Sequence, residues 1–141
     1  MAKTINTNID DGILNFTFTN NEDEVFSSFK LNPTDINVAA RAEEVIEYFK
    51  QFEDSIQKAT SGKEMAELNK QIEDKINYLL GYEASKDLFK EPITATTVFG
   101  NGQVFVYIVL DKIVEAIAPV IEKRKKKMQA AANKYTEKYT K

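Results

Sequence analysis

An apolar stripe at helical spacing runs through the last part of the chain and constrains the fold more than any other feature. Pro119 interrupts the stripe, and because proline lacks the N–H that a helix interior needs, we expect a kink there. The first half is apolar on most sides and belongs in a core, whereas the second half projects from it. The stripe predicts one helix of more than thirty residues, with members Tyr107, Leu110, Val114, Ile117, Ile121, Met128, Ala132, Tyr135 and Tyr139.

The charge of the chain divides where that second half begins. Residues 1–121 carry 11 basic and 20 acidic side chains, while residues 122–141 carry 8 basic and 2 acidic ones. We name residues 122–141 the arm and residues 1–121 the body, and the length of the body predicts a single globular domain. An acidic body with a basic, amphipathic helical arm favours a docking surface over a loose tail.

Histidine and cysteine are missing from the chain, and this limits its chemistry. The chain of 141 residues has no histidine and no cysteine, so it has no imidazole base, thiol nucleophile, disulfide framework or soft metal ligand. We therefore predict a protein that is not an enzyme, with no catalytic residue, cofactor or metal. Charges interrupt the apolar run 104–121, which predicts a buried helix and no membrane span. Without a signal-peptide profile at residues 1–6, we expect a cytoplasmic protein.

The N-terminal part predicts a β-hairpin. Apolar and polar residues alternate over residues 13–19, and a second alternating run follows the polar loop 20–24. A lone hairpin is marginal in water, so one face must pack on the helices that follow. The apolar residues of that hairpin are Leu14, Phe16, Phe18, Val25, Phe29 and Leu31.

Two amphipathic helices follow the hairpin. The first begins at Thr34 or Asp35, either of which can cap a first turn, and runs to about Ala59. Residues 60–62 break the pattern, and the second helix follows, so the pair forms a helical hairpin. The apolar faces are Val38, Ala42, Val45, Ile46, Phe49, Phe52 and Ile56 in the first helix, and Met65, Leu68, Ile72, Ile76, Leu79 and Leu80 in the second.

The pattern between Gly81 and Gly102 is weaker. Residues 84–89 fit a short helix, residues 93–99 fit either a loop or a strand, and residues 100–102 mark a turn. The fold class predicted for the whole chain is α+β, mainly α. We expect an N-terminal β-hairpin packed on a bundle of three to four helices, with the long C-terminal helix kinked near Pro119.

The basic run of the arm has several interpretations. With Tyr135 and Tyr139 it could follow phosphates while the rings stack on bases, but the acidic body would repel a polyanion. A membrane-surface role is disfavoured because the apolar face of the arm has alanines and tyrosines in place of Leu, Phe or Trp. A solvated helix end and a protein-docking role remain as the main interpretations. The run consists of Lys123, Arg124, Lys125, Lys126 and Lys127.

Short motifs elsewhere resemble ligand sites but lack essential parts. The acidic residues at 10–11 and 20–24 lack the ligand spacing of a calcium loop. Residues 61–63 lack the upstream glycine of a phosphate-binding loop, and residues 100–102 lack the third glycine of a dinucleotide fingerprint. We interpret all of them as loops and turns.

Several segments together suggest a family. They are Phe29-Lys-Leu-Asn-Pro-Thr-Asp35 before a helix with Arg41, Val98-Phe-Gly100, Ala118-Pro119, and an ending in Asn133-Lys-Tyr135 and Lys138-Tyr139. In their order, from about Ile13 to the end, the chain resembles the small tail assembly chaperones of long-tailed (siphovirus-type) phages and prophages of Gram-positive bacteria. The resemblance implies a non-enzymatic protein of the host cytoplasm. It also implies that the protein binds the tape measure protein during tail assembly, keeps it soluble and is absent from the finished particle.

A tape measure protein is an extended, helix-rich chain with exposed apolar stripes, which suits helix-in-groove docking. We expect Met128, Ala132, Tyr135 and Tyr139 to dock a partner helix or a neighbouring copy, while Lys123 to Lys127 steer acidic surfaces. Self-association is expected, and a small-molecule substrate is not. Two other classes stay open: a structural tail or connector subunit, and a nucleic-acid-binding protein that uses the arm.

Overall fold

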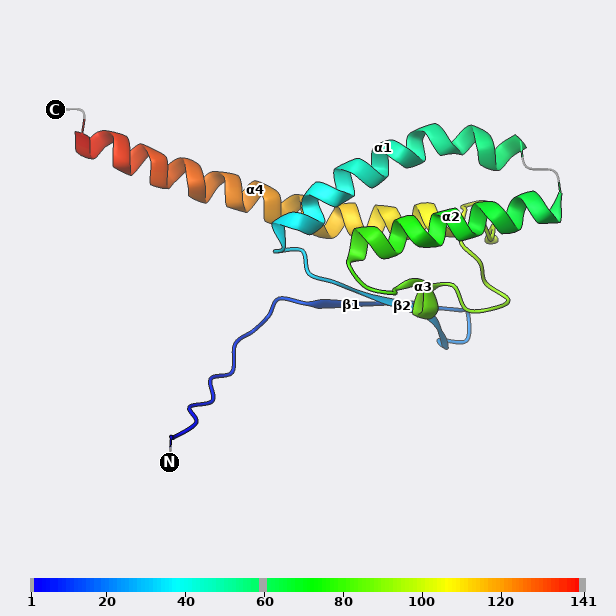
Figure 1. Ribbon diagram of the computed structural model, residues 1–141, viewed down its shortest axis with the longest axis horizontal. Helices are drawn as coiled ribbons and strands as arrows, with labels where there is room; N and C mark the ends of the chain where they lie inside the picture. Colours follow the sequence, from blue (N-terminus) through cyan, green and yellow to red (C-terminus); the bar gives the residue numbers. More distant parts are fainter. Residues whose placement is uncertain (1, 59–60, 140–141) are drawn as a thin grey trace.

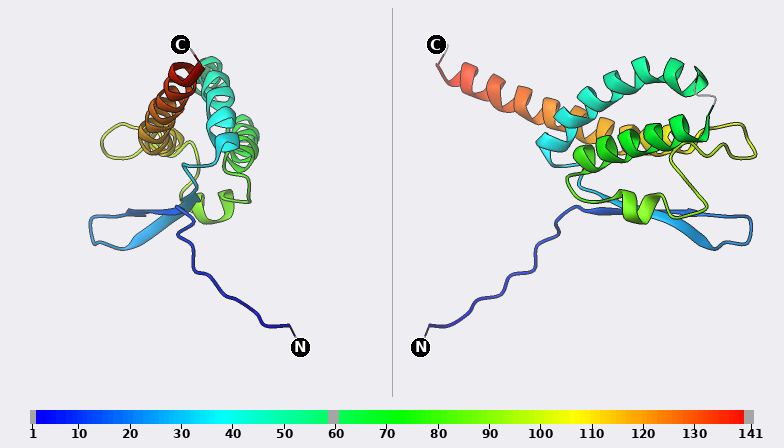
Figure 2. Two further views of the ribbon diagram at one scale, coloured as in Figure 1. Left: turned by 90° about the vertical axis from the view of Figure 1, so that its left-hand side faces the viewer. Right: turned by 45° about the vertical axis from the view of Figure 1, so that its right-hand side comes forward.

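The structure is a computed structural model that describes residues 2–58 and 61–139, without the side chains of residues 53–57 and 135–139. A two-stranded hairpin lies on one side of a layer formed by three longer helices, with one short helix beside the hairpin (Figures 1 and 2). This arrangement confirms the predicted α+β, mainly α fold. The elements in chain order are β1 (Leu14–Thr19), β2 (Val25–Leu31), α1 (Ile36–Lys58), α2 (Gly62–Leu80), α3 (Ser85–Leu88) and α4 (Phe105–Tyr139).

The antiparallel hairpin packs through aromatic side chains. Phe16 of β1 pairs with Phe29 of β2, and their rings stack with centroids 4.6 Å apart. The register shifts after Phe18, which leaves Phe26 as an extra residue whose ring approaches the core. Val25 is 59% exposed beyond this bulge, so its predicted place on the packed face is wrong.

Hydrogen bonds join β2 to the segment around α3. The buried Ser27 hydroxyl donates to the carbonyl oxygen of Leu88 at 2.7 Å. The Lys30 N–H donates to the hydroxyl oxygen of Tyr82, also at 2.7 Å, and burial raises the pKa of Tyr82. These contacts hold the hairpin on the helical layer, as a marginal two-stranded sheet requires.

The helical hairpin of α1 and α2 begins at the predicted cap, but Gly62, predicted in the break, opens α2, and the predicted end of the first helix near Ala59 lies outside the described residues. The Asp35 carboxylate accepts a hydrogen bond from the Asn37 N–H, and the Ser61 hydroxyl oxygen accepts one from the Glu64 N–H. Gly81 ends α2 in the left-handed conformation, with φ of 80°. The predicted apolar faces are buried at Val38, Ala42, Val45, Phe49, Phe52, Ile72, Ile76, Leu79 and Leu80.

The segment between α3 and α4 is a loop that caps the long helix. Its backbone carbonyl oxygens at Ala95 and Thr97 accept hydrogen bonds from the Val106 and Phe105 N–H groups, both at 2.9 Å. The Asn69 side chain of α2 holds the same loop by accepting two hydrogen bonds from Thr96. Residues 93–99 are therefore a loop, and their ladder contact is limited to one isolated bridge, Val98 with Val104.

The helix α4 is 35 residues long and changes direction near Pro119, where its colour passes from yellow to orange in Figure 1. Its buried residues are centred on Val106, Val109, Ile113 and Ile117. Val114 is 41% exposed, so its predicted place on the packed stripe is wrong. Within the described part of the chain, no helix has the length and apolar character of a membrane span.

Candidate protein-docking site

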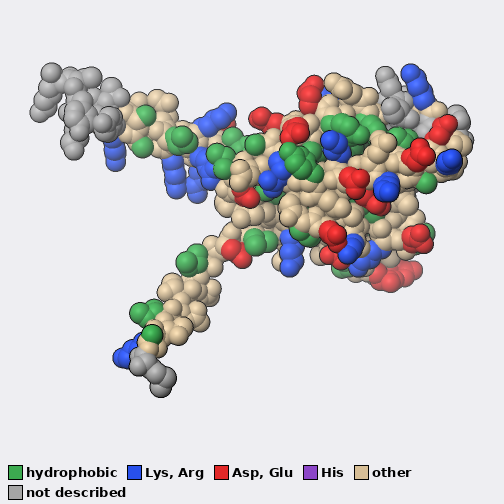
Figure 3. Space-filling view, viewed as in Figure 1, with side chains coloured by type: hydrophobic (Ala, Val, Ile, Leu, Met, Phe, Trp, Pro, Cys, Tyr) green, Lys and Arg blue, Asp and Glu red, His purple; other side chains and the backbone are tan. Residues whose placement is uncertain are grey.

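The arm leaves the body as an exposed helix. Every residue of the range 122–134 is exposed, and Lys and Arg side chains gather where the arm departs (Figure 3). Met128 is 67% exposed and presents its apolar side chain on the surface of the arm. The predicted Ala132 is also exposed, whereas the side chains of Tyr135 and Tyr139 lie outside the description.

A groove of about 300 Å³ lies between the first turns of α1 and the middle of α4. We call it the arm-root groove. Ile36 on its α1 side is 64% exposed, and the alanines beside it leave room for a close approach by another helix. The apolar residues that line the groove are Pro33, Ile36, Ala39, Ala40, Val120, Ile121 and Met128.

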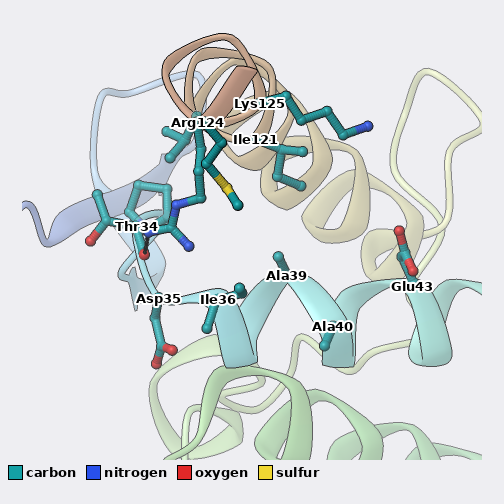
Figure 4. A pocket seen from close by; sticks show the side chains of 12 residues that line it. Thr34, Asp35, Ile36, Ala39, Ala40, Glu43, Ile121, Arg124 and Lys125 are labelled. Carbon is teal, nitrogen blue, oxygen red and sulfur yellow. Dashed lines mark hydrogen bonds between the residues drawn. The ribbon is translucent and has the colours of Figure 1, made fainter. Parts of the chain in front are cut away.

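Charged side chains stand around this apolar lining. Arg124 and Lys125 extend from α4 in different directions, with Thr34 near Arg124 and Glu43 on α1 at the other end (Figure 4). The Arg124 guanidinium donates a hydrogen bond of 2.8 Å to the carbonyl oxygen of Thr34. Arg124 therefore ties the root of the arm to the turn before α1, while Lys125 reaches along the groove.

The structure brings together some of the predicted docking residues and adds new ones. Arg124, Lys125 and Met128 line the groove, whereas Lys123, Lys126, Lys127 and Ala132 do not. The sequence analysis missed the half of the groove that α1 supplies. The signal was weak: Ile36 is an isolated apolar residue of the first turn, outside the stripe that packs in the core.

The groove suits an amphipathic helix. Its apolar floor can bury the apolar face of such a helix. Arg124 and Lys125 complement acidic residues beside that face, and Asp35 and Glu43 complement basic ones. In the described residues, no group of three or more Asp and Glu side chains is placed to hold a metal ion.

No protein-family model, curated protein or solved structure matches the chain.

Proposed function

We propose that the protein is a phage tail assembly chaperone, without enzymatic activity, that binds the tape measure protein during tail assembly and is not kept in the virion. The observation that carries the proposal is the arm-root groove, an exposed apolar surface with basic residues on its α4 side and acidic residues on its α1 side. A long helical client with exposed apolar stripes needs such a cover until it is packed. The segments from Phe29 to Tyr139 that resemble this chaperone family support the same assignment.

In this proposal, one helix of the client lies between α1 and α4. Its apolar face covers Ile36, Ala39 and Met128, and its acidic residues lie near Lys125. Full burial of a side chain such as Ile or Met contributes about 1.5–3 kcal/mol. Binding also costs the two molecules translational and rotational freedom, which offsets part of the free energy that a few such contacts contribute. The net affinity therefore allows the client to be released during assembly.

Co-expression with the tape measure protein tests the proposal. Removing residues 123–141 deletes the exposed residues 123–134 with the end of the chain that follows them, and it leaves the buried part of α4 intact. We expect the tape measure protein to move into the insoluble fraction with this truncated chain, while circular dichroism shows a folded body. A tape measure protein that stays soluble and assembles normally would contradict the proposal.

A point substitution tests the groove itself. Ile36→Ser removes an exposed apolar contact of the groove, and Val114→Ser removes an exposed apolar side chain of α4 that does not line it. We expect Ile36→Ser to weaken binding of the tape measure protein about tenfold, and Val114→Ser to leave it unchanged. Equal binding by both variants would place the client elsewhere.

The two other classes give different results in simple assays. A structural tail subunit remains in purified particles, where mass spectrometry detects it. A nucleic-acid-binding protein is retained on DNA or RNA and loses affinity steeply as salt rises, because phosphate contacts release counterions. For the chaperone we expect absence from the particles and no gel shift at moderate salt.

A further inference from the structure

A second concave surface lies at the other end of the body. This aromatic cleft, of about 740 Å³, is formed by the hairpin, the segment of residues 92–101 and the first turn of α4. Phe105 is fully buried beneath it, with ring centroids of Phe18 and Phe99 each 5.3 Å away and that of Phe26 at 5.9 Å. The cleft therefore presents half-buried aromatic rings that a partner can cover.

An acidic turn forms one edge of the cleft. Asn20 and Asn21 line the cleft, and the exposed carboxylates of Glu22, Asp23 and Glu24 follow directly. The turn is ordered, because the Asn20 side-chain oxygen accepts hydrogen bonds from the Glu22 and Glu24 N–H groups at 2.9 and 3.0 Å. An aromatic cleft beside a fixed acidic turn is complementary to a basic amphipathic helix.

The arm of this chain is a basic amphipathic helix, but it cannot reach the cleft of its own copy. Phe105 opens α4 beside the cleft, and Met128 lies 23 residues later on the same helix. At a rise of about 1.5 Å per residue, this separation is about 35 Å. Figure 1 shows the arm leaving the end of the body opposite the tip of the hairpin.

We propose that the arm of one copy docks in the aromatic cleft of a second copy. Met128 and the aliphatic stems of the lysines cover the aromatic rings, while the ammonium groups of Lys127 and Lys134, seven residues apart on one side of the helix, lie near the acidic turn. The two surfaces are different patches, so the contact is head to tail and leaves one arm and one cleft open at the ends. Repeated docking builds a chain of copies. The inference concerns contacts between copies alone and does not depend on the proposed client.

The absence of cysteine from the chain gives a direct test without any client. Ala131→Cys places a thiol on the arm, Asn21→Cys places one on the edge of the cleft, and Lys70→Cys places a control thiol on the exposed side of α2. The variants are purified separately, mixed in pairs and oxidised mildly. We expect a disulfide-linked dimer from Ala131→Cys with Asn21→Cys, and several-fold less from Ala131→Cys with Lys70→Cys. Equal yields, or a dominant dimer of Ala131→Cys with itself, would overturn the proposal.

Charge reversal provides a second measurement that does not rely on disulfide formation. One variant carries Glu22→Lys, Asp23→Lys and Glu24→Lys, and the other carries Lys127→Glu and Lys134→Glu. By light scattering at low salt, we expect wild-type protein to associate as its concentration rises and each variant alone to stay monomeric. The mixture of both variants should regain heavier species, because the reversed charges again match. Monomeric wild-type protein, or association by each variant alone, would overturn the proposal. The acidic-turn variant has an unaltered arm-root groove, so its binding of the client tests the proposed function separately.

Discussion

The two halves of α4 belong to one continuous helix but are stabilised in different ways. Residues 105–117 include the most deeply buried side chains of the molecule, whereas every residue from 122 to 134 is exposed. Packing holds the first half, and even its starting N–H groups are capped by the preceding loop. The described part of the arm has little packing and relies on residues with high helix propensity, mainly Lys and Ala. The comparison shows that packing stabilises one half of a helix while the described part of the other half is left exposed.

The largest expected loss of free energy of unfolding comes from a substitution in the buried half of α4. Ile113 is 1% exposed, and its neighbour Val114 is 41% exposed. Ile113→Ala leaves a cavity in the core, so we expect the free energy of unfolding to fall by about 2–5 kcal/mol. Val114→Ala, the matched control, should lower it by less than about 1 kcal/mol. Urea denaturation measures both, and similar losses would mean that the buried face of α4 is not the one described.

This pair of residues also shows the limit of the sequence analysis for the fold. The stripe placed Val114 on the packed face and omitted Ile113, although the length of the helix and the position of its proline were predicted. A helix that is apolar on most sides has no unique buried face in its own sequence. The elements packed around it decide the face, and their arrangement is not encoded in the periodicity of one segment.

The site was predicted to the same partial extent. Arg124, Lys125 and Met128 stood out because charge and an exposed apolar stripe coincide in the arm. Ile36 and Ala39 did not stand out, because they come from a distant segment and only tertiary packing brings them beside α4. The aromatic cleft likewise depends on the bulge at Phe26, which the alternation of the strand did not predict. A groove between two elements requires their relative placement, which local patterns do not give.

An alanine to glycine substitution should change different properties in the two halves of α4: global stability in the buried half and local helix content in the arm. Ala116 is half-buried against the core, whereas Ala131 is exposed on the arm. Alanine to glycine in a helix interior loses about 1 kcal/mol. We expect Ala116→Gly to lower the global free energy of unfolding by about that amount or more. Ala131→Gly should reduce the helical circular dichroism of the arm and leave the urea midpoint unchanged. A lowered midpoint for Ala131→Gly would show that the arm is part of the cooperative fold.

The smallest expected change in the free energy of unfolding comes from a substitution at the boundary between the two halves of α4. Arg124 donates a hydrogen bond to the carbonyl oxygen of Thr34, while Lys126 lies on the same exposed segment and is not part of the groove. Because the bond is exposed, we expect Arg124→Ala to lower the free energy of unfolding by only about 0.5 kcal/mol. Lys126→Ala should leave it unchanged within error.

A spin label at Gln129, read by its relaxation effect on the amides of α1, should report a wider range of arm positions in Arg124→Ala alone. If both variants hold the arm equally well, the described contact does not fix the arm. The boundary between the two halves then lies at Ile121, which is half-buried and is followed by the exposed residues 122–134.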